Sequence, residues 1–387
     1  MVTSTENSGD GSLAAAITAV NQASAQDRRL AQEIVINVPG KDIDKNITPL
    51  VVTARNLTIR AIGGSEIHRN QLDFDCRTAD NIILRDLRFT GDTEDDRQGK
   101  PRDTIKINAT EGRGPIGFWI DHCFFSAYFD LNITLNARDL DNEPPLLMTI
   151  SSCRFFDANP SGVNSRNHGA LGLHGFTDDE DGDDETGNNN GNNNGNNNNS
   201  NNKNSGDGNN SDNDSNSSSN NDAGRNQRTN AYVTVCRNYF DHVRRRSPRS
   251  SGLTVVHAFN NVLFKWGTDT ANADQQSGMA SGHDGRLVAE ANYFEHNVFT
   301  EAISVSGKFS PRLTVPADGL KRNMYDTGTM VPVTVGNAII ISDEYVTGLN
   351  DAGVPKIEVM QPCVQEMTTA LRDDIISQAG ETAANRA

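Results

Sequence analysis

Four arginines lie within six positions of the stretch HVRRRSPRSSG, which covers residues 242–252. The chain around them is acidic, with 35 Lys and Arg against 51 Asp and Glu and a formal net charge of -16 at pH 7. Guanidinium groups at this density can hold an anionic ligand or stabilise negative charge that develops in a reaction. The cluster is therefore the first candidate site, and it needs a rigid scaffold. It consists of Arg244, Arg245, Arg246 and Arg249.

The arginine cluster has three interpretations, and each predicts a different structural environment. It can be a site for an anionic ligand, the solvated edge of a turn between strands, or an Arg-Ser tract that is phosphorylated or binds nucleic acid. The tract RRRSPRSS lies between two strand-like runs, YVTVCRNYF and LTVVHAFNNVLF, and not in a polar tail. This position favours a site held by folded structure.

Much of the polarity of the chain is local. Hydrophobic residues make up 35% of the sequence, and the segment 178–228 consists almost wholly of Asn, Gly, Ser and Asp. That segment carries eleven acids and three bases, which is half of the net charge. It cannot bury enough apolar surface to offset the entropy of ordering. We therefore expect one domain over 1–387, with 178–228 as a long disordered Asn-rich insertion within it.

Charge, hydropathy and cysteine content argue against several classes of protein. An acidic surface disfavours nonspecific binding to nucleic acid and to anionic membranes. No run of 18 apolar residues is present, and the start MVTSTENSGDGS lacks the features of a signal peptide, as in an intracellular protein or a mature form with an added Met. The cysteines are too few for a disulfide scaffold and lack metal-site spacing, so most are expected in the core. They are Cys76, Cys123, Cys153, Cys236 and Cys363.

Seven β-rich runs recur along the chain, each followed by turn residues. Once the 51 residues of 178–228 are subtracted, the intervals between their anchor residues range from 20 to 38 and contain no helical pattern. One stackable unit with insertions of variable length is typical of a parallel β-solenoid. The anchors are Leu57, Ile82, Ile120, Ile150, Val233, Leu253 and Leu287.

The repeat predicts interior rows and covered ends. Three cysteines follow their anchors by three residues and should stack as small buried side chains, and three asparagines near strand ends should form a ladder of turn residues. Helices are expected from Gly11, with Ser12 as the N-cap, and up to Gly380, where they can cover the open ends of the solenoid. The two rows are Cys123, Cys153 and Cys236, and Asn238, Asn261 and Asn292.

The stretch FDHVRRRSPRSSGLTVVHAFNN resembles the arginine segment of the pectate lyase family of polysaccharide lyases. Six further pieces agree with that family in the same order: SGDGSLAAAI, NIILRDLRF, RDTIKI, FWIDHCFFS, MTISSCRF and RLVAEANYFE. The resemblance covers nearly the whole chain outside the Asn-rich segment. It implies an all-β fold, a right-handed parallel β-helix, in a secreted enzyme that cleaves acidic pectic polysaccharide, polygalacturonate, by β-elimination. We expect a monomer.

The resemblance also implies roles for particular residues. In that family an arginine removes the C5 proton of the substrate, and the spacing from Phe240 places this base at Arg246. An arginine base should favour alkaline pH, because it must be unprotonated when it acts. The remaining cations in matching segments, Arg249, Arg244 and Arg166, are expected to bind substrate carboxylates.

Calcium is the cofactor that the resemblance implies, as a bridge between substrate carboxylates and protein acids. Asp103 falls on the first acidic position of the family, and the nearest oxygens to its second acidic motif are those of Asp130 and Asn132. One certain carboxylate with an amide makes a sparse ligand set for a hard cation.

Departures from the family pattern leave two alternatives open. Ser251 stands where the family has a second arginine, and a lysine expected in the groove is not evident. The chain can therefore be a non-catalytic β-helix that binds polysaccharide, or a calcium-independent lyase for methyl-esterified pectin. Asp121, His122 and His257 are expected to be structural.

Overall fold

The computed structural model describes the chain in segments. These are residues 1–6, 8–38, 42–43, 48–68, 70–91, 103–109, 117–126, 131–137, 145–156, 169–175, 229–243, 245–266, 277–283, 285–295, 301–306, 312–314, 323–326, 331–334, 339–340 and 364–380. The predicted insertion 178–228 lies outside them. No helix among the described residues is long and apolar enough to cross a membrane.

Three sheets contain the strands that these segments form. Sheet A holds β1 Gln32–Ile36, β4 Arg55–Ala61, β7 Asp80–Arg85, β10 Gly117–Asp121, β13 Leu146–Ser151, β16 Ala231–Cys236, β19 Thr254–Phe259, β22 Arg286–Glu290, β25 Arg312–Thr314 and β28 Ile339–Ile340. Sheet B holds β2 Asp42–Ile43, β5 Glu66–His68, β8 Arg88–Thr90, β11 Phe124–Ser126, β14 Arg154–Phe156, β17 Tyr239–Asp241, β20 Val262–Phe264, β23 Tyr293–Glu295 and β26 Met324–Tyr325. Sheet C holds β3 Leu50–Val52, β6 Leu72–Asp75, β9 Ile105–Ala109, β12 Leu131–Ala137, β15 Gly169–Gly175, β18 Arg249–Gly252, β21 Met279–Gly282, β24 Glu301–Ser306 and β27 Val331–Thr334.

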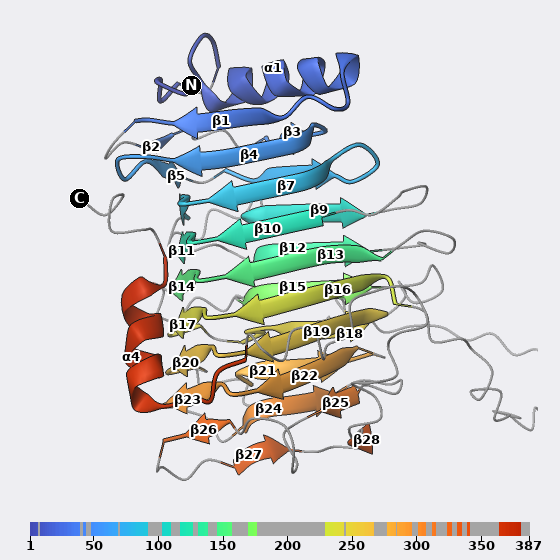
Figure 1. The fold of residues 1–387 in the computed structure, drawn as a ribbon, viewed down its shortest axis with the longest axis vertical. Coiled ribbons are helices and arrows are strands. Elements are labelled where there is room, and N and C mark those ends of the chain that lie inside the picture. The colour runs from blue at the N-terminus through green and yellow to red at the C-terminus, as the bar shows by residue number, and fades with distance from the viewer. Residues whose placement is uncertain are drawn as a thin grey trace, which may run out of the picture. The chain divides into compact units, whose positions relative to one another are not determined.

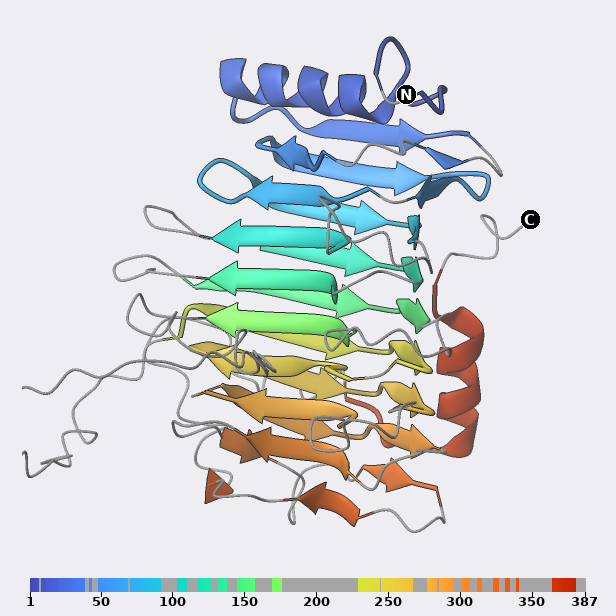
Figure 2. The same ribbon diagram turned by 180° about the vertical axis from the view of Figure 1, so that it is seen from behind.

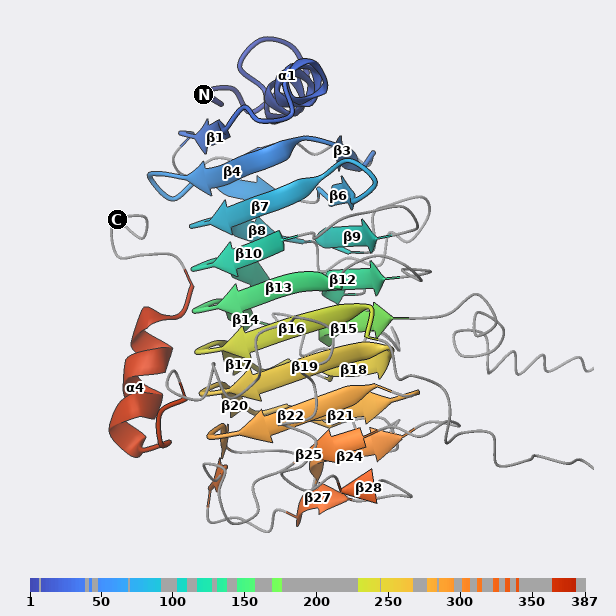
Figure 3. The same cartoon turned by 45° about the vertical axis from the view of Figure 1, so that its right-hand side comes forward.

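The chain visits the three sheets in turn and pairs each strand with the strand one coil away. The pairings within each sheet are parallel, and the strand numbers rise by three from neighbour to neighbour (Figure 1). Sheet A faces the viewer in Figure 1 and sheet C in Figure 2, while Figure 3 shows the coils edge-on. This is a parallel β-helix, as the repeat predicts. Its register continues across the gap between β15 and β16, because Ile150 still pairs with Val235.

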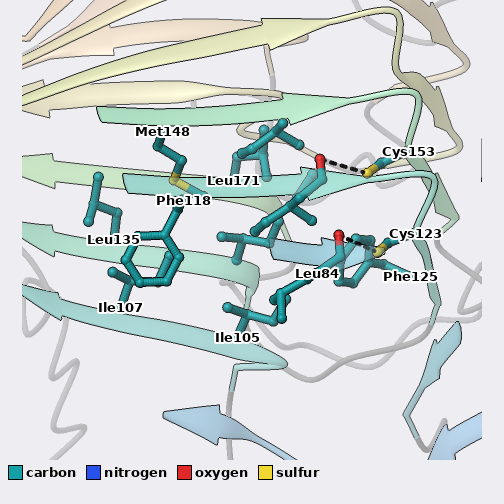
Figure 4. Packing of buried hydrophobic residues seen from close by; sticks show 14 of the residues in the cluster. Leu84, Ile105, Ile107, Phe118, Cys123, Phe125, Leu135, Met148, Cys153 and Leu171 are labelled. Carbon is teal, nitrogen blue, oxygen red and sulfur yellow. Dashed lines mark hydrogen bonds between the residues drawn. The ribbon is translucent and has the colours of Figure 1, made fainter. Parts of the chain in front are cut away.

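The interior of the coils is filled by rows of identically placed apolar side chains. Inward positions alternate with outward ones along each strand, so a row gains one buried residue per coil. Phe118 and Met148 are neighbours in one such row, and Ile107, Leu135 and Leu171 lie in the same part of the core (Figure 4). Stacked phenyl rings make another row, with centroids 4.9–5.3 Å apart: Phe89, Phe125, Phe155 and Phe240.

The turns between sheets A and B repeat the same two-residue geometry. The first residue adopts a left-handed φ of 50° to 56° and the second points inward. The first residues are Asp86, His122, Ser152, Arg237, Asn260 and Ala291. The second residues are Leu87, Cys123, Cys153, Asn238, Asn261 and Asn292. The turn therefore provides one buried row that changes from apolar to amide side chains along the stack.

The predicted asparagine ladder is confirmed in this row. The backbone N–H of Asn238 donates to Asn261 Oδ1 at 3.0 Å, and that of Asn261 donates to Asn292 Oδ1 at 3.0 Å. Each side-chain amide also donates to a strand carbonyl, as Asn261 Nδ2 does to Val235 O at 2.8 Å. The ladder thus satisfies buried backbone groups that would otherwise lack partners.

Two cysteines follow Leu87 in the row, and one prediction for the cysteines is wrong. Cys123 and Cys153 are fully buried, and each thiol donates to a carbonyl of the preceding coil (Figure 4). Burial raises the pKa of the Cys153 thiol, which fits an inert core residue. Cys236, by contrast, pairs with Ser151 and lies half-buried on the outward side of β16. Inward residues recur at every second position of a strand, so neighbouring inward positions look alike in a sequence. The anchor of this coil, Val233, lies two residues before Val235, which is the register partner of Ile150.

The described residues form two helices beside the coils, and of these two only α1 covers an end. Helix α1, Leu13–Gln26, begins at the predicted N-cap, where Ser12 Oγ accepts from the Ala15 N–H, and it lies over the first coil (Figure 1). Helix α4, Thr369–Gln378, ends before Gly380, which has a φ of 91°. It does not cap the stack as predicted but lies along its side, with the Gly380 N–H bonded to Ser152 O (Figure 1).

Candidate functional site

The arginine turn is part of sheet C. Its described residues, 245–249, lead into β18, and their backbone is bonded on both sides. The Ala170 and Leu171 N–H groups of β15 donate to the carbonyls of Arg245 and Arg246, at 3.3 and 2.8 Å. On the other side the Ser247 N–H donates to Gly278 O at 2.9 Å. Neighbouring coils therefore fix the position of the turn.

Arg246 has an unusual backbone conformation for its place in the fold. Its φ is 57°, in the left-handed region that favours glycine. Eight of the other eleven described non-glycine residues with positive φ follow a strand of sheet A or B, where every coil turns. Arg246 lies instead in the turn before a strand of sheet C. Such a conformation costs a non-glycine residue roughly 1 kcal/mol or more and persists where surrounding contacts enforce it.

Beside the turn, β15 presents almost no side chain. A Cβ at Gly169 would lie 2.9 Å from Arg245 O and 3.0 Å from both Arg246 Cβ and Leu131 Cδ2. A Cβ at Gly172 would lie 2.5 Å from Leu131 Cδ1. The two glycines thus leave space that Leu131 occupies, next to the base of the Arg246 side chain. We refer to Gly169 and Gly172 as the glycine track.

A row of outward residues crosses the glycine track from strand to strand. Gly172 is the register partner of Thr134 on β12 and of Arg249 on β18, and Thr134 pairs in turn with Lys106 on β9. Strands are about 4.8 Å apart, so Lys106 and Arg249 are separated by about 14 Å. Asp73 on β6 is the register partner of Lys106 and ends this row with an acid. The two cations on either side of the glycine track suit an extended anionic ligand that lies across the strands.

A second outward row is joined by hydrogen bonds. Asn136 Nδ2 donates to Asn108 Oδ1 at 3.2 Å, and Asn108 Nδ2 donates at 2.7 Å to Oδ1 of Asp73, the register partner of Lys106 in the first row. In the next coils His174 Nδ1 lies 2.7 Å from Ser251 Oγ. Burial raises the pKa of Asp73, and the charge of Lys106 and the Asn108 hydrogen bond only reduce that rise. The second row therefore consists of amide, imidazole and hydroxyl groups, which can exchange hydrogen bonds with the hydroxyl groups of a ligand.

Three buried side-chain oxygens in this region have no hydrogen-bond partner among the described residues. They are Thr104 Oγ1, Asn132 Oδ1 and Thr134 Oγ1, all on or next to β9 and β12. Most buried side-chain polar atoms in proteins have a partner, and an exception in a candidate site points to a bound ligand or solvent. The outward side of β12 is therefore ready to accept hydrogen bonds.

Calcium does not fit the described residues of this region. No group of three or more His, Cys, Asp or Glu side chains that could hold a metal lies within the described segments. The Thr104 N–H donates to Leu131 O at 3.1 Å, so the neighbouring residue Asp103 lies near the start of β12. The neighbouring outward groups are the neutral oxygens of Asn132 and Thr134 and the apolar Leu131. Calcium favours several oxygen ligands with adequate negative charge.

The remaining predicted site residues have two outcomes. Arg166, Arg244 and Asp130 lie outside the described residues. Arg246 and Arg249 flank the glycine track, and Asp103 and Asn132 belong to adjacent coils. Sequence reasoning missed several residues of the region. Their available signal was GALGLHG, where two glycines three apart interrupt an apolar strand. The missed residues are Lys106, Leu131, Gly169, Gly172 and His174.

The histidines that were expected to be structural have structural partners. His257 Nε2 lies 2.8 Å from Glu290 Oε1, and both side chains are buried on sheet A. His122 Nδ1 lies 2.8 Å from Asp121 Oδ2, at a turn of sheet A. Neither pair lies on sheet C, where the arginine turn is.

Comparison with known proteins gives structural neighbours only. The sequence matches no family model and no curated protein. Among solved structures, a pectate lyase from a Bacillus species in complex with trigalacturonate aligns over 95% of this chain and 90% of its own, with 15% identity and a TM-score of 0.48. A pectate lyase from a Paenibacillus species aligns over 84% and 82%, with 14% identity and a TM-score of 0.47. Pectate lyase II of Xanthomonas campestris aligns over 90% and 81%, with 14% identity and a TM-score of 0.42.

Proposed function

We propose that this protein is a polysaccharide lyase that cleaves polygalacturonate by β-elimination at the outward face of sheet C, outside the cell. The observation that carries the proposal is the position of Arg246. Its backbone is held in a left-handed conformation by hydrogen bonds from neighbouring coils, beside the glycine track. The sequence motif around it, which resembles the catalytic segment of pectate lyases, supports the same assignment.

In the proposed reaction Arg246 is the base. The C5–H bond breaks and its proton passes to the Arg246 side chain, while the C5 electron pair forms the C4–C5 double bond. The bond between C4 and the glycosidic oxygen then breaks, and that oxygen leaves with the electron pair and takes a proton from solvent. A guanidinium is normally protonated, and the positive charges of Arg245 and Arg249 disfavour its protonated form. The rate should therefore rise with pH.

The other residues of the face would bind the substrate. Arg249 and Lys106 would hold carboxylates on the two sides of the glycine track, and a cation next to the reacting C5 would stabilise the negative charge that develops there. Asn132 and Thr134 would accept hydrogen bonds from sugar hydroxyls with their buried oxygens. No step requires the calcium ion that the resemblance implies.

One observation favours a second candidate, a calcium-independent lyase for methyl-esterified pectin. The side chain next to Arg246 over the glycine track is Leu131, and the outward groups of β12 are neutral. An esterified uronate carries no charge for a metal to bridge, and its methyl group can contact an apolar side chain.

The test is ultraviolet absorbance of the unsaturated uronate product. The wild type and the variants Arg246→Ala and Arg246→Lys are given polygalacturonate or methylated pectin at neutral and alkaline pH, with calcium or with chelator. Removal of a general base should lower kcat by about 10²–10⁴-fold without changing the melting temperature. Arg77→Ala is the matched control. Arg77 is exposed, forms an ion pair with Asp75 and is not part of the proposed site.

The outcomes separate the candidates. Product from polygalacturonate that disappears in Arg246→Ala supports the first, and product from methylated pectin alone supports the second. Absence of product from either substrate in the wild type would refute both.

A further inference from the structure

A single large aromatic side chain is exposed on the described surface. Trp119, on the outward side of β10, is 42% exposed, and the other exposed large hydrophobic residues of the described segments are aliphatic. The second tryptophan of the chain, Trp266, is 1% exposed. An exposed indole offers a flat apolar face on which a ligand can stack and an N–H that can be held by a hydrogen bond.

The Trp119 ring is held in place by polar contacts underneath it. Its Nε1–H donates to Ser151 Oγ at 2.9 Å, and the Ser151 hydroxyl donates to Asp121 Oδ1 at 2.7 Å. The second oxygen of Asp121 lies 2.8 Å from His122 Nδ1. Burial raises the pKa of Asp121, but the hydrogen bonds from His122 and Ser151 and the charges of His122 and Arg85 outweigh it, so the pKa lies below its ordinary value. A buried, ionised carboxylate thus fixes the orientation of an exposed ring.

A cation lies on the same face, one coil away. Arg85 on β7 is the register partner of Asp121, and its Nε lies 3.5 Å from Asp121 Oδ2 and 3.6 Å from Asp86 Oδ2. The side chain of Arg85 is 46% exposed, whereas those of Asp86 and Asp121 are 13% and 7% exposed. The guanidinium of Arg85 is therefore the most exposed charged group of this cluster, and the two carboxylates lie beneath it.

The surroundings of Trp119 suit a ligand that is narrow and carries hydroxyl groups. Its register partners on the outward face are Ile83 and Thr149, and the exposed Leu147 lies on the next strand. Only two of these side chains are large, apolar and widely exposed, whereas a stable protein interface takes about 20–30 residues from each partner. A sugar ring has an apolar C–H face that can stack on an indole and a polar edge that can reach Arg85.

We propose that Trp119 and Arg85 form a second binding site for a uronate polysaccharide chain, on sheet A and separate from the arginine turn of sheet C. The indole stacks on one sugar ring, and the guanidinium holds the carboxylate of that ring or of its neighbour. The site performs no chemistry and retains the polymer on the protein. This inference rests on the proposed function for the identity of the polymer.

The experiment uses tryptophan fluorescence, because only one of the two tryptophans is exposed. Oligogalacturonate is titrated into the full chain carrying Arg246→Ala, so that the ligand is not cleaved. We expect a saturable change in emission that is lost when Trp119→Phe is added. Retention on insoluble polygalacturonate should fall roughly tenfold in Trp119→Ala and less in Arg85→Gln. Leu30→Ala, which removes an exposed aliphatic side chain between α1 and β1, should leave retention unchanged.

Two further measurements keep the test independent of folding and of the lyase proposal. Ser151→Ala keeps the indole of Trp119 but removes the hydroxyl that accepts its Nε1–H hydrogen bond. The emission should therefore still change when oligogalacturonate is added, but the Kd should be higher. Turnover of short oligomers by Trp119→Ala in the otherwise wild-type chain should equal that of the wild type.

Unchanged retention in a folded Trp119→Ala variant, or emission that does not respond to oligogalacturonate, would overturn the second site. Failure of the lyase proposal has a different signature, because the wild type would then form no unsaturated product while Trp119-dependent binding remained.

Discussion

The outward faces of sheets A and C are built from the same coils and carry opposite kinds of side chain. On β15 of sheet C the outward position Gly172 has no side chain, and on β10 of sheet A the outward positions include Trp119 and Asp121. Inside, both sheets bury the same apolar rows. The comparison teaches that the inward residues hold the coils together, whereas outward residues are free to make a binding surface of either shape.

The two faces also treat their polar groups differently. On sheet A the buried carboxylate of Asp121 receives two hydrogen bonds, from Ser151 and His122. On sheet C the oxygens of Asn132 and Thr134 are buried without a partner. A satisfied network fixes a side chain in place, and an unsatisfied one is available to a ligand.

Alanine substitutions at one glycine of each face should separate them most strongly. Gly169→Ala on sheet C brings a methyl group within 2.9 Å of Arg245 O and 3.0 Å of Arg246 Cβ, so the arginine turn must shift. We expect activity to fall about 10²-fold, since displacement of a reacting group by about 1 Å has effects of that size, and stability to fall by about 1–3 kcal/mol. Product absorbance and urea denaturation measure the two effects.

The matched change on sheet A should have the opposite sign. At Gly117 the nearest atom to a new methyl group is Asn81 Cα at 4.0 Å. Gly117→Ala should therefore raise stability by about 0.5 kcal/mol through the unfolded state and leave activity intact. Equal destabilisation at both glycines would show that the glycine track has no special role.

Replacing one aspartate on each face should give opposite pH dependences. The folded-state pKa of Asp121 lies below its ordinary value, so its ionised form stabilises the fold above the unfolded pKa of about 4, and this contribution is lost as the pH falls through the folded pKa. Asp121→Asn should lower stability at neutral pH by about 1 kcal/mol, and the difference from wild type should shrink in acid.

Asp73 on sheet C has a raised folded-state pKa because of burial, so its protonated form is favoured in the fold. Its contribution is fully present below the unfolded pKa and is lost as the pH rises through the folded pKa. Relative to wild type, Asp73→Asn should therefore gain stability between acid and neutral pH. Melting temperatures across this range check both variants, and slopes of the same sign would contradict the assignment.

A smaller contrast is expected from two threonines. Thr134→Val on sheet C removes a buried hydroxyl that has no partner and should stabilise the protein by about 1 kcal/mol while weakening substrate binding, which appears as a higher KM. Thr149→Val on the more open face of sheet A should change stability by less than about 0.5 kcal/mol. If Thr134→Val binds substrate as well as the wild type, the buried oxygen of Thr134 is not part of the site.

More of the fold than of the candidate site could be predicted from the sequence. Recurrent strand-like runs predicted the coils, and recurrent asparagines predicted the turn ladder. Both patterns are visible because each interior row of a stacked repeat receives one residue per coil. It could not place Cys236, since adjacent inward positions of a strand have the same pattern. It also missed the location of α4, because the helix pattern gives no information about which coils the helix contacts.

The site was partly visible because its motif is contiguous. Arg246 and Arg249 share one turn, so a local match found both. Lys106, Leu131 and Gly172 come from other coils, and their proximity follows only from the register of β9, β12, β15 and β18. Leu131 in particular resembles a core residue in the sequence, although it lies over the glycine track.

Helix α4 has a consequence for how the protein unfolds. In a solenoid each coil contacts only its neighbours, so a terminal coil can open alone. The segment around α4 contacts four consecutive coils, through Gly380 to Ser152, Asp374 to Arg237, Gln365 to Asn260 and Arg372 to Glu295. These coils must therefore open together with the helix. Fraying from the C-terminal end should stop there, which makes this part of the β-helix a single cooperative unit that includes the arginine turn.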